Sequence, residues 1–463
     1  MTENEVQIAK LRQGLSGSSG QNYQIADQIG LGGMSAGVFD IANYPGYVAK
    51  IGFYSNPDEL NILREYKDLN SWQILADIGD MHEAGNKSFL NRQLFQTETT
   101  SGRALREAFI NWVLTNNTSH PNLSKIVDGP LIQSIGDDEE SYAVGIICEK
   151  ITGLSLYGLL EATKKFTSKA YILPALTYSQ LLTGVANALD FLHSEDIIHR
   201  DVKPTNIIVG QTASDLRNGY GDKAYLIDLG LALRKSVTLG RSVIGSPNYM
   251  APEVTNASGN ASSASDQFSL AVIMLEMLSG SYPLARTGSN LEKALSAIRN
   301  KCQYELNSPY LLKAKLGLEA NAANIIFEFL KIGIDYIPDR RFRTCQVMVG
   351  LTTAMLESLN RINITSTSSN PLIEFETDLE RLNTGQISEA AIPFALAKHS
   401  ILLREPALLE SKLLINNLRE ALKLSLKAKP QLMQKYGELL GFVLTTDASQ
   451  NVTQLFEFIG LRT

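Results

Sequence analysis

A short polar stretch, HRDVKPTNII at residues 199–208, lies between two apolar runs. It places an acid (Asp201), a cation (Lys203) and an amide (Asn206) close together. An acid here can accept the proton of an attacking hydroxyl, a lysine can neutralise a phosphoryl group, and an amide oxygen can bind a divalent ion. This spacing favours phosphoryl-transfer chemistry, but the composition alone is also that of a plain surface loop.

Two more charged residues lie in apolar runs that predict strands. Lys50 belongs to the run GYVAKI, and Asp228 follows YLI, directly before a leucine and a glycine. A buried charge is costly unless it is paired. Lys50 is therefore either a cation that reaches nucleotide phosphates or an edge-strand lysine that extends to solvent. Asp228 is expected to bind a metal ion.

Three glycines, Gly30, Gly32 and Gly33, lie in the run IGLGGMSAGVF between two strand-like segments. Glycine lets backbone N–H groups approach a phosphate, because no side chain blocks them. The run lacks the Gly-Lys-Ser/Thr ending of a Walker loop, and a strand rather than a helix is expected to follow it, unlike in a Rossmann fingerprint. By itself the run is also typical of a hairpin turn.

The elements that would position these residues follow from the apolar spacing. Alternation predicts strands within residues 24–53, and strand character returns at 123–134 and 142–150. Apolar residues three and four apart predict helices from about 56 to 118 and over most of the chain after 155. The first third is therefore a small sheet with helices beside it, and the remainder is mainly helical.

Composition narrows the class of protein. The 463-residue chain has a net charge of −6, with 44% hydrophobic and 19% charged residues. This balance excludes a strongly basic nucleic-acid binder, no apolar stretch is long enough to predict a membrane span, and the N-terminus lacks the layout of a secretory signal. Three separated cysteines, Cys148, Cys302 and Cys345, predict buried thiols of a reducing compartment. We therefore expect a cytoplasmic protein, in a host cytosol if it is a delivered effector.

Taken together, these segments resemble a eukaryotic-type (Hanks-type) protein serine/threonine kinase in a bacterial-like variant. The resemblance covers about residues 22–355. HRDVKPTNIIV resembles the catalytic loop, and DLG at 228–230 resembles the metal-binding DFG element. Three later segments resemble the end of the activation segment, the buried helix after it and the late arginine element: GSPNYMAPE at 245–253, DQFSLAVIMLEMLSGSYPL at 266–284 and PDRR at 338–341.

The resemblance implies an α+β, bilobal protein-kinase fold with a small antiparallel-sheet lobe, a larger helical lobe and a C-terminal helical extension. We expect a polar tail at 1–21, the small lobe at 22–150 with a helical insertion at about 55–100, and the large lobe at 151–360. A Ser/Thr/Asn-rich linker then leads into a helical domain at 372–463. That domain either packs permanently on the large lobe or docks a regulatory partner or a second copy of the chain.

The resemblance also implies roles for the site residues. Asp201 is the expected catalytic base and Lys203 the phosphate-stabilising cation, while Asn206 and Asp228 would hold Mg2+. The ATP-binding residues would be Gly30, Leu31, Gly32, Gly33, Met34, Ser35, Val38, Lys50, Glu107, Glu149 and Ile151. Ser35 stands where the family usually has its third glycine, within a GGMS run that bacterial-type relatives share.

Further assignments concern residues outside the nucleotide site. Cys148 is expected as the gatekeeper, and Glu253 and Arg341 as a buried pair that braces the larger lobe. Thr238 and Ser242 are the candidate activation-segment phosphosites, because Arg200 can pair with a phosphate there.

The helix carboxylate that pairs with Lys50 has two candidates. Glu107, in LREAFINWVL, best fits the local wording of the family, but it requires the insertion at about 55–100. Glu65, in ILREYKDL, lies at the usual distance from the lysine but leaves a long stretch before the next strand. We favour Glu107.

The resemblance implies an enzyme that transfers the γ-phosphoryl of MgATP to serine or threonine hydroxyls of a protein substrate. One alternative is a pseudokinase that acts as a scaffold, whose usual mark is loss of the catalytic aspartates, the strand lysine or the asparagine. Another is a small-molecule phosphotransferase, which generally lacks the APE segment. This sequence has both aspartates, the strand lysine, the asparagine and the APE segment, which argues against both alternatives.

Overall fold

The computed structural model describes residues 11, 14–30, 37–54, 60, 63–64, 68–69, 73–74, 107–108, 110, 120–135, 141–163, 172–218, 222–234, 246–255, 261–279, 320–358 and 397. The chain divides into two compact units. The first unit comprises Met1–Leu156 and Phe191–Gly245, and the second comprises Tyr157–Asp190 and Ser246–Thr463. None of the helices in these described ranges is long and apolar enough to cross a membrane.

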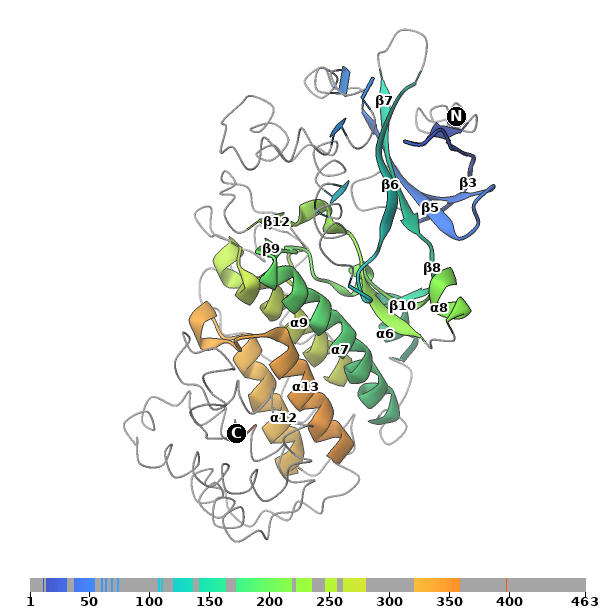
Figure 1. Cartoon of the computed structure of the whole chain (residues 1–463). Helices are drawn as coiled ribbons and strands as arrows, with labels where there is room; N and C mark the ends of the chain where they lie inside the picture. Colours follow the sequence, from blue (N-terminus) through green and yellow to red (C-terminus); the bar gives the residue numbers. More distant parts are fainter. Residues whose placement is uncertain are drawn as a thin grey trace, which may run out of the picture. The chain divides into compact units, whose positions relative to one another are not determined.

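A five-stranded antiparallel sheet dominates the first unit (Figure 1). Its strand order is β3-β4-β5-β7-β6. The strands are β3 (Ile25–Gly30), β4 (Gly37–Ile41), β5 (Tyr47–Tyr54), β6 (Ile126–Ser134) and β7 (Tyr142–Glu149). They are rich in β-branched and aromatic residues, which suit the half-buried surface of a sheet. The predicted small antiparallel sheet is confirmed.

The alternation of side chains along β5 separates the two faces of this sheet. Ala49 and Ile51 are fully buried in the apolar core on one face. Lys50 lies between them in sequence and therefore points to the opposite face. Val38 and Ile146 are the cross-strand partners of Lys50 on its two sides. Cross-strand partners share a face, so these three side chains form a row opposite the core.

The N-terminal segment differs from the polar tail expected at 1–21. β1 (Leu15–Ser16) pairs with β2 (Asn22–Tyr23), and Leu15 is completely buried in the core of the sheet. A Cβ atom at Gly145 of β7 would lie 2.6 Å from Leu15 Cδ2, so the missing side chain of Gly145 makes room for Leu15. Within residues 1–21, Leu11 and Leu15 both belong to the core of the sheet, so this part of the chain is not a solvated tail, because the burial of two leucines outweighs the polarity of their neighbours.

A three-stranded sheet carries the chain segments next to the polar stretch 199–208. Its order is β11-β10-β8, and both pairs are antiparallel. β8 (Ile151–Ser155) follows β7, β10 (Ile207–Thr212) follows the polar stretch, and α8 (Ala213–Arg217) leads towards β11 (Lys223–Leu226). Two short strands pair with each other: β9 (Ile197–Ile198), which precedes β10 in the chain, and β12 (Leu233–Arg234), which follows β11.

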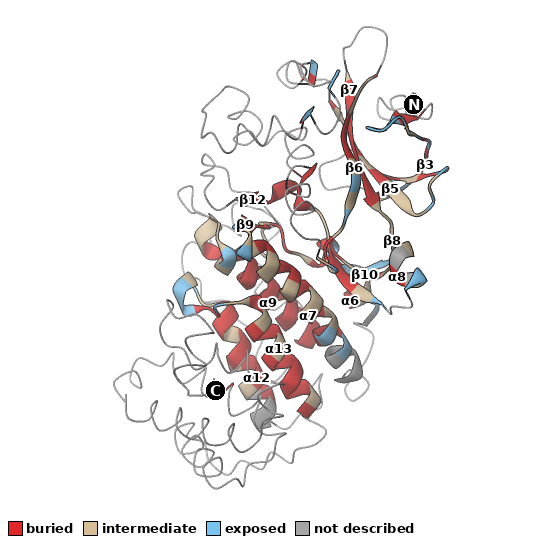
Figure 2. Ribbon diagram, viewed as in Figure 1, coloured by how far each residue is buried: buried red, intermediate tan, exposed pale blue. Residues whose placement is uncertain are grey.

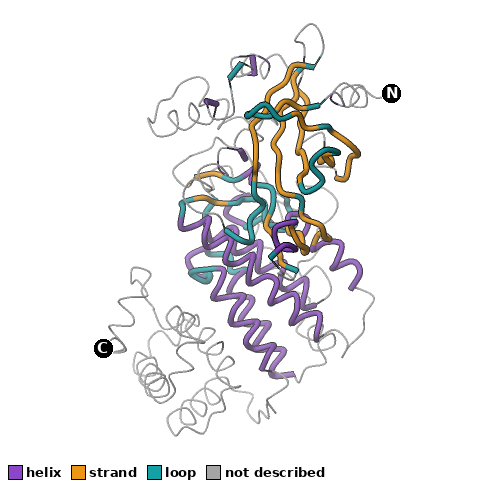
Figure 3. Tube along the Cα trace, turned by 45° about the vertical axis from the view of Figure 1, so that its right-hand side comes forward, coloured by secondary structure: helices purple, strands orange, loops and turns teal. Residues whose placement is uncertain are grey.

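Helices make up most of the described part of the second unit (Figures 1 and 3). They are α6 (Leu156–Thr163), α7 (Ile172–Ser194), α9 (Ser263–Ser279), α12 (Ala320–Gly333) and α13 (Cys345–Ser358), of which α6 and α7 each cross a unit boundary. α9 is buried on all sides from Ser265 to Ser279, as its apolar sequence predicts (Figure 2). Asp190 of α7 accepts from the N–H groups of Cys345 and Gln346, at 2.8 and 2.9 Å, and so caps α13.

The predicted α+β class is confirmed by a sheet-rich first unit and a helical second unit. The helical domain predicted at 372–463 lies outside the described residues except for Ala397, which is buried. Most of the insertion predicted at about 55–100 also lies outside them. Within it, Leu60, Leu63 and Ile74 are described and are buried.

Candidate active site

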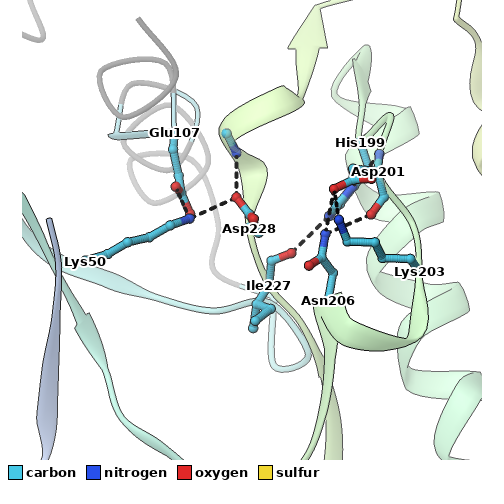
Figure 4. Close-up of polar contacts among 9 residues, drawn as sticks. Lys50, Glu107, His199, Asp201, Lys203, Asn206, Ile227 and Asp228 are labelled. Atoms are coloured by element: carbon cyan, nitrogen blue, oxygen red, sulfur yellow. Dashed lines mark hydrogen bonds and ion pairs between the residues drawn. The ribbon is translucent and has the colours of Figure 1, made fainter. Parts of the chain in front are cut away.

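Lys50, Glu107 and Asp228 form one charged cluster in the first unit (Figure 4). The Lys50 ammonium donates to Glu107 Oε2 at 2.6 Å and to Asp228 Oδ1 at 2.8 Å. The side chains of Lys50 and Glu107 are 20% and 8% exposed, so water screens their attraction only weakly. Of the two candidate partners, the structure places Glu107 against Lys50, whereas Glu65 lies outside the described residues.

Burial and charge act in opposite directions on the pKa values of this cluster. Burial alone would lower the pKa of Lys50, but the two carboxylates raise it above its ordinary value. Burial alone would raise the pKa of Asp228, but the Lys50 ammonium holds it down at about 2. Burial raises the pKa of Glu107 despite the nearby ammonium, and the charge of Asp228 adds to this effect. With both carboxylates ionised, the cluster carries excess negative charge.

The backbone around Asp228 aims its carboxylate. Asp228 has φ 68° and ψ 75°, a left-handed conformation that costs a non-glycine residue free energy. Its side chain accepts a hydrogen bond from Gly230 N–H at 3.4 Å, in the turn Leu229–Leu231. On the other side, Ile227 N–H donates to the Asn206 carbonyl at 2.9 Å. This bond ties the Asp228 segment to the polar stretch.

Asp201, Lys203 and Asn206 form a second cluster (Figure 4). Asp201 Oδ2 accepts from Lys203 Nζ at 2.6 Å and from Asn206 Nδ2 at 3.1 Å, and Nδ2 also reaches the Asp201 carbonyl at 2.9 Å. The 3-10 turn Pro204–Asn206 brings the amide back over the acid. In the described part of the chain no donor reaches Asn206 Oδ1, so this oxygen is left for another ligand.

His199 is a site residue to which sequence reasoning assigned no role. It is fully buried, and its Nδ1 accepts from Asp201 N–H at 3.3 Å. Its Nε2 therefore carries the proton and donates to the Ile227 carbonyl at 3.2 Å. The imidazole thus joins the backbone before Asp201 to the backbone before Asp228. The burial of His199 could have been predicted from its position directly after the two isoleucines of β9.

The predicted hinge lies where β7 ends and β8 begins. Cys148 lies on the same face of the sheet as Lys50, because both follow the alternation of their paired strands. Burial raises the pKa of Cys148 to about 12, so its thiol stays protonated near neutral pH and is not a nucleophile. Glu149 N–H donates to the Lys125 carbonyl at 2.9 Å, and Ile151 opens β8.

The predicted phosphate-covering loop is described only at its two ends. Gly30 ends β3 and is the cross-strand partner of Val38, which in turn lies opposite Lys50. The other predicted loop residues lie outside the described part of the chain: Leu31, Gly32, Gly33, Met34 and Ser35. The candidate phosphosites Thr238 and Ser242 lie outside it as well. The sheet therefore places Val38 beside Lys50 and Gly30 one strand further away, and the roles of the remaining residues stay predictions.

The predicted pair of Glu253 and Arg341 is confirmed in the second unit. Arg341 Nη1 and Nη2 donate to the two Glu253 oxygens at 2.7 and 2.8 Å. The guanidinium also donates to the carbonyls of Asp335 and Ala264, at 2.8 and 2.9 Å. Its carbon lies 4.9 Å from the ring centroid of Phe268. This bidentate arrangement around a fully buried guanidinium holds three segments of the unit together.

The oxygen atoms of the first unit's clusters suit a divalent cation. Mg2+ prefers hard oxygen ligands, which the Asn206 amide and the Asp228 carboxylate provide. Three carboxylates face two ammonium groups across the two clusters, namely those of Glu107, Asp201, Asp228, Lys50 and Lys203. The donor set and the charge balance therefore fit Mg2+ with an attached phosphate group.

Comparison with known proteins gives a family. A family model described as "Protein kinase domain" matches residues 81–349, more than half of the chain. The matched range contains Asp201, Asn206, Asp228 and the Glu253–Arg341 pair, and it begins after Lys50. The resemblance noted from the sequence started earlier, at about residue 22.

Three curated relatives are kinases by name. The chain is 30% identical over 204 residues to mitogen-activated protein kinase kinase kinase 3 of Arabidopsis thaliana, covering 44% of this chain and 28% of the relative. It is 28% identical over 245 residues to cAMP-dependent protein kinase type 3 of Saccharomyces cerevisiae, covering 51% and 56%. It is 29% identical over 181 residues to the probable serine/threonine-protein kinase PknB of Lactococcus lactis, covering 39% and 25%.

The chain spans between about a quarter and a little over half of the length of these relatives. The family model, in contrast, spans the polar stretch, the segment of Asp228 and the brace in the second unit as one continuous match. The chain therefore belongs to the protein kinase domain family.

Proposed function

We propose that the chain transfers the γ-phosphoryl group of MgATP to a serine or threonine hydroxyl of a protein substrate. One observation carries the proposal: the bond from Ile227 N–H to the Asn206 carbonyl joins the Asp201 cluster to Asp228. A carboxylate base, a phosphate-binding cation and two oxygen ligands for a metal thereby lie in one compact unit. The name of the Lactococcus lactis relative, a probable serine/threonine-protein kinase, supports the class of acceptor.

Asp201 is the proposed base. Its Oδ2 is oriented by Lys203 and Asn206, so the carboxylate is preorganised to accept a hydroxyl proton. As the hydroxyl oxygen bonds to the γ-phosphorus, its proton passes to Asp201, the bond to the β–γ bridging oxygen breaks, and ADP leaves. Lys203, whose Nζ lies 2.6 Å from Asp201 Oδ2, stabilises the charge on the transferring oxygens.

A second group of residues is proposed to hold the nucleotide. Mg2+ bound together with the nucleotide would neutralise negative charge on the phosphate groups. Asn206 and Asp228 are its proposed ligands, and Lys50 is proposed to bind the α- and β-phosphates while Glu107 fixes its ammonium. The backbones of Glu149 and Ile151 are proposed to contact adenine, and Gly30 to Val38 to cover the phosphates.

Substitution Asp201→Asn tests the proposal. The amide keeps the shape of the side chain but cannot accept the hydroxyl proton, so transfer to a generic protein substrate should fall about 100- to 10,000-fold. Calorimetry should give nearly the wild-type affinity for MgADP. Asp222→Asn, which changes an exposed carboxylate of the same unit, is the matched control and should leave transfer unchanged.

Other outcomes separate the alternatives. Transfer by the Asp201→Asn variant within about threefold of wild type would remove Asp201 from the reaction. Wild-type protein that binds MgATP but transfers nothing would be a pseudokinase. Transfer to a small-molecule hydroxyl with none to protein would indicate a small-molecule phosphotransferase.

A further inference from the structure

Two glycines, Gly153 and Gly210, face each other where β8 and β10 pair. A Cβ atom at Gly153 would lie 2.0 Å from the Val209 carbonyl oxygen. A Cβ atom at Gly210 would lie 2.2 Å from the Thr152 carbonyl oxygen. Both obstacles are backbone atoms, which cannot turn away as the end of a side chain can. A side chain at either position would therefore push the two strands apart.

Close approach is the reason for glycine at these positions. Among the described glycines, Gly14, Gly20 and Gly129 have a positive φ, whereas Gly153 and Gly210 do not. Their backbone angles are therefore open to other residues. Gly153 is exposed and Gly210 is buried, so burial does not explain why both positions are glycine. What they share is the contact between the two strands.

These strands carry two different parts of the proposed nucleotide site. Ile151, proposed to contact adenine, opens β8 two residues before Gly153. Asn206, a proposed metal ligand, lies four residues before Gly210 and directly before β10. At about 3.3 Å per residue, these groups lie roughly 7 and 13 Å along the chain from the glycine pair. A change in the strand separation is therefore carried directly to both.

The segment of Asp228 is held by β10 and not by β8. β11 pairs with β10 through Ile207 and Leu226, and Ile227 N–H donates to the Asn206 carbonyl. Asn206 and Asp228 are therefore held together by the pairing of β10 with β11. The two glycines lie on the other edge of β10, where it pairs with β8 in the described three-stranded sheet.

We propose that Gly153 and Gly210 are positioning residues, which set the distance between the adenine-binding backbone at Ile151 and the metal ligands Asn206 and Asp228. The inference rests on the proposed nucleotide site. A methyl group at either glycine displaces one half of the site from the other without changing any group that contacts the nucleotide. A misplacement on the order of 1 Å can cost about 100-fold in a site of this kind.

Gly153→Ala and Gly210→Ala test the proposal with three probes. Adenosine reports on the Ile151 side alone, magnesium pyrophosphate reports on the phosphate side formed by Lys50, Asn206 and Asp228, and MgADP needs both sides at once. Calorimetry and ligand-observed NMR should show near wild-type affinity for the first two probes and about 100-fold weaker binding of MgADP. The double variant should lose no more than either single variant, because one separation of the strands relieves both collisions.

Gly46→Ala is the matched control. Its Cβ would meet Ala213 Cβ at 3.7 Å, an ordinary contact, so all three affinities should be unchanged. Melting temperatures are measured for every variant. Loss of all three probes in parallel with a lower melting temperature, or failure of both variants to fold, would leave a purely structural role and overturn the proposal.

Unchanged binding of MgADP in both folded variants would also overturn the positioning role. Wild-type protein that binds no MgADP would instead reject the nucleotide site itself. The two proposals therefore fail in different ways: one in the variants alone, the other already in the wild type.

Discussion

Two buried charge clusters of this protein are built in different ways. In the second unit, Arg341 meets a single carboxylate, Glu253, through two hydrogen bonds of 2.7 and 2.8 Å, and further donors reach backbone carbonyls. In the first unit, Lys50 meets two carboxylates, Glu107 and Asp228, at 2.6 and 2.8 Å. The arginine pair is balanced, whereas the lysine cluster retains negative charge when both carboxylates are ionised.

The cations of the two clusters differ in exposure. The Arg341 side chain is 0% exposed and its partner Glu253 is 18% exposed, whereas the Lys50 side chain is 20% exposed and the Asp228 side chain is 28% exposed. A charge-balanced pair whose cation is fully buried is suited to a structural role, while an unbalanced cluster with a partly exposed carboxylate can bind a cation or a phosphate. We infer that charge balance distinguishes the structural cluster from the proposed functional one. Of the four substitutions below, in order of decreasing effect, the first three test this inference and the fourth concerns a buried uncharged amide.

Arg341→Met should have the largest effect on stability. It leaves the Glu253 carboxylate and two backbone carbonyls without their donor, and should lower the free energy of unfolding by about 3–5 kcal/mol in denaturant titrations. The double variant Arg341→Met/Glu253→Leu should recover most of this loss, because it also removes the unpaired charge. A single variant as stable as wild type would contradict a structural role for the pair.

Lys50→Met should act mainly on activity. Loss of the ammonium removes the proposed phosphate contact, and transfer should fall about 100- to 1,000-fold. The remaining two carboxylates raise each other's pKa, so the stability of the variant relative to wild type should fall as the pH rises and they are forced to ionise. Lys331→Met, in an exposed pair with Glu328, is the control and should change neither quantity appreciably. Normal transfer by the Lys50 variant would place the functional cluster elsewhere.

Asp228→Asn should show how strongly Lys50 stabilises the ionised carboxylate. The pKa of Asp228 falls from 3.8 to about 2, so its ionised form contributes about 2 kcal/mol of stability above pH 5. A depressed pKa means that this contribution is present above the unfolded-state value and is lost as the pH falls through the folded-state value. Urea unfolding of both proteins from pH 7 to pH 3 should therefore show a constant difference that narrows below about pH 4. A difference that does not depend on pH would refute the coupling.

Gln267→Met should have the smallest effect, with the opposite sign. The Gln267 Oε1 atom in α9 is buried and has no hydrogen-bond partner among the residues that the structure describes. Methionine is of similar size and apolar, so the free energy of unfolding should rise by about 1 kcal/mol. Gln180→Met, on an exposed side chain, is the matched control and should give no such gain. A destabilised Gln267 variant would show that the amide has a partner that matters.

Local features of this protein could be predicted from the sequence. Asp201, Lys203 and Asn206 lie within a few residues of one another, so a single turn is enough to bring them together. The apolar run around Lys50 predicts that β5 is a strand, and the uninterrupted apolar character of α9 predicts its burial. Each of these features depends on neighbours in the chain.

Contacts between distant segments could not be predicted in the same way. The choice between Glu107 and Glu65 depends on the path of the chain between the lysine and the acid, which are 57 residues apart for Glu107. Leu15 was not predicted as a core residue because it packs against Gly145, which belongs to a strand far away in the sequence. The roles of His199 and of the Gly153–Gly210 pair likewise depend on partners from other segments.

By itself, the sequence determined the family, the α+β class and the side-chain chemistry offered by Asp201, Lys203, Asn206 and Asp228, while the pairing of Glu253 with Arg341 was implied by the resemblance to that family. Only the tertiary structure decided which carboxylate meets Lys50, how Asn206 is tied to Asp228, and which strands need glycine to approach each other. The physical reason is the range of the interactions. Turn geometry and side-chain periodicity are set by residues next to one another in the chain, whereas ion pairs and strand contacts are set by the packing of segments that the sequence keeps far apart.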